Sequence, residues 1–301
     1  MDTKRGSALR MNKKIALWFL VGCALLWSTS GFLIKSINLS PMAISGGRSL
    51  IAALFLILTR GWPKLSSHPV FWGAVISYAA TLTSFVIATR MTTAADAILL
   101  QYTAPIFVLL FGYIFLKEHI TRIDILATSL VMGGLVIFFL DSIGGGRSTT
   151  AMIGNALAVF SGVCLGLQAV LMRKVRLIGL SAESVLISGN LLCFLVAIPA
   201  LIPSRPSGMD ILWLSVLGIV QLGVSYLLYT AVLSYVTSLE LILVPIIEPL
   251  LNPVIVYIMR GEKPGPTTII GGAFILIVVV IWCLYRGRQY ESAQDEKASV
   301  L

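Results

Sequence analysis

The sequence predicts an all-α polytopic membrane protein with ten transmembrane helices, arranged as two inverted-topology repeats of five helices each. Three observations lead to this fold class: the composition, the lengths of the apolar segments, and a match between the two halves of the chain. Of the 301 residues, 57% are apolar and 12% are charged, and the mean hydropathy is +0.95. An ordinary soluble domain carries about 25% charged residues, and a chain of this size would not hide so much apolar surface from water.

Ten apolar segments of about 18 to 24 residues are each long enough to cross roughly 30 Å of hydrocarbon at a rise of 1.5 Å per residue. Turn-forming residues separate them. We expect the spans at 15–35, 42–59, 70–89, 94–116, 122–140, 152–172, 182–202, 211–232, 240–259 and 267–285. The first span follows Lys13 and Lys14 as a signal peptide would, but it lacks a small-residue cleavage pattern, so we expect it to be retained.

The basic residues predict the orientation of these spans. Of the 22 Lys and Arg residues, 15 fall in the terminal segments and the loops on the same side, whereas five fall in the opposite loops. By the positive-inside rule both termini are cytoplasmic, and we expect a multi-pass protein of the cell (inner) membrane. The net charge of +9 does not indicate nucleic acid as a partner, because the basic residues are spread over short separate segments.

The two halves of the chain align at a fixed offset of 144 residues. LLQYTAPIFVLLFGYIFLKE, from residue 99, lies over LVPIIEPLLNPVIVYIMRGE, from residue 243, so that Pro105 falls on Pro249 and Tyr113 on Tyr257. Each half holds five spans, and an odd number places the second half upside down relative to the first. The expected organisation is a cytoplasmic segment 1–14, a first repeat 15–140, an outer linker 141–151, a second repeat 152–285 and a disordered cytoplasmic tail 286–301.

Three stretches carry a resemblance to a known family: WSTSGFLIK in the first expected span, LLQYTAPIFVLLFGYIFLKE in the fourth and IIEPLLNPVIVYIMRGE in the ninth. In these stretches the chain resembles the EamA family of the drug/metabolite transporter superfamily, and the similarity runs from about residue 15 to residue 286. The resemblance implies a secondary transporter, often an exporter of small metabolites such as amino acids. It also implies a central cavity between spans 1 to 4 and 6 to 9, with spans 5 and 10 at the periphery.

Glu248 is the most informative residue, because it lies about 12 Å into the bilayer, two helical turns after Glu240. A carboxylate that faced lipid there would cost about 3 kcal/mol by insertion scales, so it should face the protein interior or a wet cavity. Two interpretations remain open. Glu248 is either a hydrogen-bonded structural carboxylate, or a site that holds a cationic part of a substrate or binds and releases a proton.

Four prolines and one amide accompany this carboxylate. Pro245, Pro249 and Pro253 each lack an amide hydrogen, and Pro105 occupies the equivalent place in the first half. We expect helix breaks at all four, because each leaves the carbonyl four residues earlier without its helical partner. Asn252 lies one turn after Glu248 and extends the same polar face.

Apart from Lys35 and Arg122 at the ends of their spans, Arg48 is the only basic residue inside an expected span. Its side chain either snorkels to the nearby outer interface, or forms a gate or an ion pair with Glu248. The other candidate binding residues are aromatic, amide and hydroxyl side chains: Trp27, Ser28, Ser30, Tyr78, Thr81, Gln101, Tyr102, Gln168, Gln221, Ser225, Tyr226 and Tyr229. Each of these is alternatively a packing residue that hydrogen-bonds a neighbouring helix.

Several function classes find no support in the sequence. GGGR at 144–147 lacks the spacing of a phosphate-binding loop, and His68 and His119 form no metal-binding motif. Cys23, Cys164, Cys193 and Cys283 are isolated in apolar segments. We therefore expect no cofactor, no metal and no enzymatic activity.

The function that we expect is a secondary active transporter that exports small organic metabolites, amino acids or related amines, by alternating access. Proton coupling is one role open to Glu248. We expect a monomer or a weak homodimer in the bilayer. The alternative is a non-transporting membrane sensor or assembly partner that uses the same fold.

Overall fold

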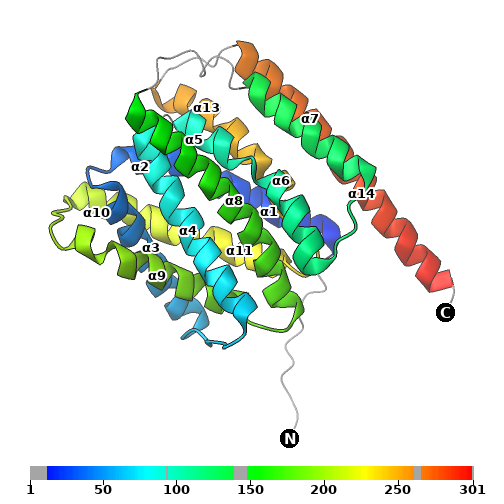
Figure 1. Ribbon diagram of the computed structural model, residues 1–301, viewed down its shortest axis with the longest axis horizontal. Coiled ribbons are helices and arrows are strands. Elements are labelled where there is room, and N and C mark those ends of the chain that lie inside the picture. The colour runs from blue at the N-terminus through cyan, green and yellow to red at the C-terminus, as the bar shows by residue number, and fades with distance from the viewer. Residues whose placement is uncertain (1–11, 93, 139–147, 261–265, 300–301) are drawn as a thin grey trace, which may run out of the picture.

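The computed structural model describes residues 12–92, 94–138, 148–260 and 266–299, and these residues form helices with no strand among them. In Figure 1 the helices lie side by side in a bundle, and the pair α7 and α14 runs along one edge. The α-helices are α1 Lys13–Trp27, α2 Ser30–Ser36, α3 Pro41–Arg60, α4 Pro69–Met91, α5 Ala94–Gln101, α6 Ala104–Phe111, α7 Arg122–Phe138, α8 Thr149–Leu177, α9 Ala182–Leu201, α10 Gly208–Ser215, α11 Ser225–Val232, α12 Glu240–Leu243, α13 Ile247–Arg260 and α14 Pro266–Ser299. The described residues also form two π-helical segments, η1 Gly112–Leu116 and η3 Val216–Val224, and one 3₁₀ segment, η4 Val244–Ile246. Most of the expected cytoplasmic segment and outer linker lie outside the described residues.

Six stretches of the described chain are long and apolar enough to cross a membrane, judged by length and composition. They are Lys13–Ser36, Pro41–Arg60, Pro69–Met91, Thr149–Leu177, Ala182–Leu201 and Gly208–Val232. Of the other four expected spans, 94–116 and 240–259 are interrupted helices and 122–140 contains the 17-residue α7. The span 267–285 lies within the continuous helix α14, and the apolar stretches found in these regions, Ala104–Leu116 and Ile269–Trp282, are shorter than a full span. Large apolar side chains cover the outside of the bundle, for example Leu58 at 86% exposed and Trp18 at 72%. This surface suits lipid, and the protein is a multi-pass membrane protein.

Local sequence fixes where several helices begin. Ser40 accepts a hydrogen bond from the amide of Ala43 at 3.3 Å, and Pro41 occupies the first turn of α3. Ser207 and Asp210 form a reciprocal capping box at the start of α10. These contacts satisfy amide groups that have no partner within the helix.

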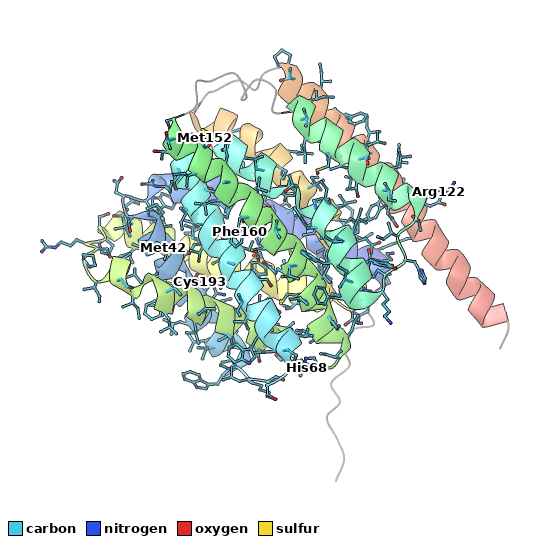
Figure 2. The ribbon with its side chains drawn as sticks, in the orientation of Figure 1. Met42, His68, Arg122, Met152, Phe160 and Cys193 are labelled. Atoms are coloured by element: carbon cyan, nitrogen blue, oxygen red, sulfur yellow. The ribbon has the colours of Figure 1, made fainter. Side chains whose placement is uncertain are left out.

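Helices from the two halves of the chain pack against one another. α4 runs antiparallel to α8, because Gly73 faces Leu171 at one end of the pair and Gly154 faces Met91 at the other. Figure 2 places the beginnings of these two helices, at His68 and Met152, at opposite ends of the bundle. Three further pairs also join a helix of the first half to a helix of the second half: α1 contacts α11, α3 contacts α9, and α7 contacts α14. The core of the bundle therefore lies between the halves and not within either one.

The segment 15–35, which we expected as a continuous helix, and the segment 94–116, in which we expected a break at Pro105, are both interrupted. The segment 15–35 breaks at Ser28 and Thr29, whose hydroxyls donate to the carbonyls of Ala24 (2.6 Å) and Leu26 (2.8 Å). Such bonds offer the backbone an alternative to the regular helical pattern. The segment 94–116 breaks between α5 and α6, at Tyr102 and Thr103, one turn before the expected proline break. Pro105 cannot donate to the carbonyl of Gln101, so the helix is free to deviate there.

The segment 240–259 is divided at Pro245, as predicted, but the breaks expected at Pro249 and Pro253 are wrong, because α13 continues through both. Pro249 lies in the first turn of α13, where a missing amide hydrogen costs no helical hydrogen bond. α12 ends at Leu243, and the chain passes through η4 before α13 begins at Ile247. Pro249 is buried, as is Pro105 in the first half. The side chains of Asn252 and Pro253 lie outside the described residues.

The C-terminal tail differs from its expected state. We expected disorder over 286–301, whereas α14 continues to Ser299. No proline follows Pro266, and the tail is rich in Arg, Gln, Glu, Ala and Lys, which favour helix. At the other end of α14, Gly134 of α7 packs closely on Phe274 and Ile275, which holds these two helices together.

Candidate functional site

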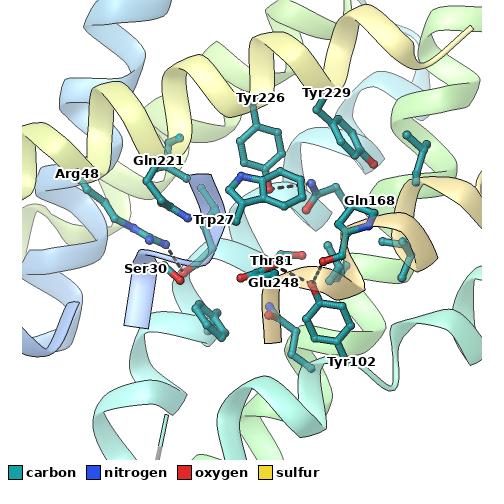
Figure 3. A pocket seen from close by; sticks show the side chains of 18 residues that line it. Trp27, Ser30, Arg48, Thr81, Tyr102, Gln168, Gln221, Tyr226, Tyr229 and Glu248 are labelled. Atoms are coloured by element: carbon teal, nitrogen blue, oxygen red, sulfur yellow. Dashed lines mark hydrogen bonds between the residues drawn. The ribbon is translucent and has the colours of Figure 1, made fainter. Parts of the chain in front are cut away.

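A cavity of about 60 Å³ lies between helices of both halves (Figure 3). Twelve of its lining residues are ones that the sequence singled out: Trp27, Ser30, Arg48, Thr81, Gln101, Tyr102, Gln168, Gln221, Tyr226, Tyr229, Pro245 and Glu248. None of the described residues of α7 or α14 lines it. This agrees with the peripheral place that the family resemblance implies for the fifth and tenth spans.

Glu248 reaches this cavity from the first turn of α13 and is only 9% exposed. The hydroxyl of Tyr102 donates to its Oε2 atom at 2.8 Å and lies 3.1 Å from the carbonyl oxygen of Pro245. That carbonyl is the one that Pro249 leaves without an amide donor. Tyr102, at the break between α5 and α6, therefore contacts two polar groups of the broken segment 240–259: the carboxylate of Glu248 and the carbonyl of Pro245.

Arg48 lies in α3 and is 1% exposed, so the snorkelling interpretation is wrong. Its Nη2 atom donates to the carbonyl of Leu82 at 3.1 Å, and its Nε atom has no partner among the described residues. The ion pair with Glu248, which the sequence left open as an alternative, is absent too, since no nitrogen of Arg48 lies within 4.0 Å of the carboxylate. Both charged groups nevertheless border the same cavity, with Arg48 to the left of Glu248 in Figure 3. The two charged groups belong to different helices, Arg48 to α3 and Glu248 to α13, and the packing of these helices keeps the charges apart.

Aromatic rings form one wall of the cavity. The ring of Trp27 lies 5.2 Å from that of Tyr226 and 5.8 Å from that of Tyr229, and its Nε1 atom donates to Ser225 at 2.7 Å. Tyr78 lies one layer further out: its ring contacts Tyr226 at 5.0 Å and its hydroxyl accepts from Asn190 at 3.0 Å. Tyr78 therefore supports the wall and does not line the cavity.

Amide side chains complete the lining. Gln101 donates to the hydroxyl of Ser161 at 2.7 Å, and that hydroxyl donates to the carbonyl of Thr81 at 3.2 Å. Gln168 donates to the hydroxyl of Tyr226 at 3.3 Å. The Oε1 atoms of Gln168 and Gln221 have no partner among the described residues. These oxygens are available to a solute in the cavity.

Two residues of α8 that the sequence analysis did not single out position the break near Tyr102. Ser161 anchors Gln101, as described above, and Gly162 lies directly behind the break. A Cβ atom on Gly162 would come within 2.7 Å of the Gln101 carbonyl oxygen and 2.8 Å of the Thr103 hydroxyl. The signal for this contact was the G-x-x-x-G spacing of Gly162 and Gly166, a pattern that allows membrane helices to approach closely.

Ion pairs join the halves at the end of the bundle where α1 begins. Lys13 lies 2.7 Å from Glu240, which is 1% exposed. Glu118 pairs with Arg173 of α8 and accepts a hydrogen bond from Ser238 at 3.0 Å. The partner of Glu118 thus comes from the other half of the chain.

Comparison with known proteins identifies the family. The sequence profile of the EamA-like transporter family matches residues 14–140 and again residues 152–284. The chain belongs to the EamA-like transporter family. A protein of Clostridium kluyveri described as an "Uncharacterized transporter" is 28% identical over 269 residues, which cover 83% of this chain and 80% of that protein.

A solved structure, titled only "Crystal structure of protein", shares the fold of this EamA-like chain with a TM-score of 0.74 at 19% identity. The match covers 93% of this chain and 99% of the solved one. The family and the similar chain support a membrane transporter. Both regions matched by the EamA-like profile contribute to the cavity: Arg48 and Tyr102 come from the first, and Tyr226 and Glu248 from the second.

Proposed function

We propose that this membrane protein is a secondary active transporter that exports small organic metabolites, amino acids or related amines, by alternating access. In this proposal two inverted repeats, 15–140 and 152–285, provide ten spans of the inner membrane, with both termini in the cytoplasm. The observation that carries the proposal is the buried carboxylate of Glu248 in a cavity lined by both repeats. Ionisable groups at membrane depth are rare in proteins and mark substrate or proton pathways.

The helix contacts support the inverted symmetry. If the first span exchanges with the sixth and the third with the eighth, the contact between α1 and α11 becomes the contact between α8 and α4, which is also present. The contacts α3 with α9 and α7 with α14 map onto themselves. Such a pattern allows one half to rock against the other around a central site, so that the cavity opens to each side in turn.

The size of the cavity favours a contracted state in such a cycle. Its volume of about 60 Å³ is well below the roughly 300 to 1,000 Å³ of small-molecule sites. The pairs Lys13 with Glu240 and Glu118 with Arg173 tie the halves together at one end. A substrate would enter or leave after these ties have opened.

Hydrogen bonding at Glu248 supports coupling to protons. The hydroxyl of Tyr102 has one hydrogen and faces two acceptors, the carboxylate of Glu248 and the carbonyl of Pro245. When Glu248 takes up a proton it can itself donate to the Tyr102 oxygen, and Tyr102 then donates to Pro245. Proton binding would thus change the bond between the two broken helices without breaking their contact.

Flux through reconstituted protein tests the proposal. Purified protein in liposomes should exchange labelled amino acids or amines, with a rate that depends on pH and responds to a pH gradient. Replacing Glu248 by Gln should remove that dependence. Exchange that kept its pH profile in this variant would contradict the coupling role. If no compound of a broad amino-acid and amine panel moves, with or without a gradient, the transport proposal is wrong and a non-transporting role gains support.

A further inference from the structure

The cavity gathers buried polar atoms that have no partner among the described residues. They are Arg48 Nε, Gln168 Oε1, Gln221 Oε1 and the hydroxyl of Tyr229. Buried polar atoms in proteins nearly always bind another protein group, a water molecule or a ligand. One of these atoms is a cationic donor, two are neutral acceptors, and the hydroxyl can act as either. The cavity can therefore bind a solute that offers a hydrogen-bond acceptor to Arg48 and hydrogen-bond donors to the two glutamine oxygens.

Arg48 supplies the cationic side of the cavity. One nitrogen of its guanidinium is held by the carbonyl of Leu82, and no carboxylate forms an ion pair with it in the described part of the chain. Its backbone is fixed by close packing, since a Cβ atom on Gly218 of η3 would lie 2.7 Å from the Arg48 carbonyl oxygen. A buried charge without a counter-charge is costly, and a guanidinium matches a carboxylate in shape and in hydrogen-bonding pattern.

Glu248 supplies the opposite charge in the lining of the same cavity. Tyr102 donates to one of its oxygens, and no basic side chain pairs with it among the described residues. The amide oxygens of Gln168 and Gln221 add two neutral acceptors to the lining, and the rings of Trp27 and Tyr226 face the cavity beside them. Acceptors and aromatic faces together suit an ammonium group.

We propose that the cavity binds zwitterionic amino acids, with Arg48 holding the substrate carboxylate and Glu248 receiving the substrate ammonium group. This assignment rests on the proposed transport function and narrows it, because amines without a carboxylate would leave Arg48 unmatched. A zwitterion placed between Arg48 and Glu248 supplies each with a counter-charge that no described residue of the chain provides. Arg48 then determines specificity: it selects solutes that carry a carboxylate.

The first test uses the unaltered protein in liposomes and varies only the solute. The probes are the twenty common amino acids, and for each one that moves, its amide, its N-acetyl form and the amine that lacks the carboxylate. We expect each modified compound to move about 10- to 100-fold more slowly than its parent, which is the range of a lost charged hydrogen-bonded pair. Amides and decarboxylated amines that move as fast as the parents would overturn the role of Arg48, while transport itself would stand. If no probe moves at all, the transport function fails as well.

The second test alters the arginine. Arg48→Gln should slow amino-acid exchange by about 10- to 100-fold and leave slow amine exchange unchanged, whereas Arg48→Lys should restore part of the lost rate, because it keeps the charge but not the planar fork. Arg60→Gln, at the exposed end of the same helix, is the matched control and should behave as the unaltered protein. Equal losses for amino acids and amines in both Arg48 variants would assign Arg48 to packing and overturn the inference.

Discussion

The two segments that meet at the cavity, 94–116 and 240–259, occupy equivalent places in the two halves and yet present different chemistry. Each is broken one turn before the shared proline, Pro105 or Pro249. At the first break stands Tyr102, where the second half has Ile246; at the second stands Glu248, where the first half has Ala104. Both halves therefore share the helix interruption, whereas the polar side chains of Tyr102 and Glu248 each occur in one half only.

This difference teaches that a repeated backbone can hold a single, unrepeated site. The two breaks bring Tyr102 and Glu248 within 2.8 Å of each other, so one half contributes the donor and the other the acceptor. Two identical acids at this point would repel each other, and two tyrosines would leave no site for a cation or a proton. Each half consequently needs the other to complete the site.

The largest expected effect comes from removing the acid. Glu248→Gln should slow exchange by about 100-fold and abolish its pH dependence, because the lost charged interaction is worth roughly 3 kcal/mol. Exchange in liposomes at a series of pH values measures both. Glu183→Gln, which pairs with Arg176 away from the cavity, serves as control and should change little.

Moving the acid across the symmetry sharpens the comparison further. The double variant Ala104→Glu with Glu248→Ala should remain inactive, because Ile246 stands where the new acid would need its tyrosine partner. Recovery of pH-dependent exchange in the double variant would show that the halves are interchangeable and that Tyr102 is dispensable.

The next effect concerns the donor. Tyr102→Phe removes the hydroxyl that contacts both Glu248 and Pro245, and we expect exchange to fall about 10-fold with an altered pH profile. Tyr113→Phe is the matched control, since Tyr113 is 64% exposed. A Tyr102→Phe protein with unchanged rate and pH profile would remove the hydroxyl from the mechanism.

A smaller effect is expected where α8 supports the first break. Gly162→Ala should lower stability by about 1 kcal/mol, because its Cβ atom would press on the carbonyl of Gln101. Thermal unfolding in detergent measures the change. Gly22→Ala is the control: Gly22 lies in α1, which packs on η4 and α13 of the second break, and the nearest atom to its added Cβ is a side-chain carbon 3.7 Å away. Equal losses for both variants would mean that the first break does not depend on close approach of α8.

The smallest effect concerns the ion pair between the halves. In a double-mutant cycle of Glu118→Gln and Arg173→Gln, we expect a coupling energy of about 0.5 kcal/mol, since both side chains keep some exposure, 22% and 18%. Stability in detergent supplies the four values of the cycle. Additive losses would leave Ser238 as the contact that ties Glu118 to the second half.

Local sequence predicted most of the elements but not their continuity. The breaks near Pro105 and Pro245 followed from the missing amide hydrogens, whereas the break at Ser28 depends on hydroxyl bonds that helices also tolerate without breaking. The π-helical segment η3, which brings Gly218 against Arg48, carried no local signal. Its irregular pattern is set by close packing on α3.

The sequence by itself determined that this is a membrane protein, which segments are apolar, that one acid lies inside an apolar segment, and that its two halves match. These features depend on composition, length and spacing, which are local quantities. Only the tertiary structure decided that Tyr102 is the partner of Glu248, 146 residues away, and that Arg48 is buried with no carboxylate of the described residues in an ion pair with it. Such pairings depend on how helices from opposite halves pack, and residue spacing along one helix carries no record of that packing.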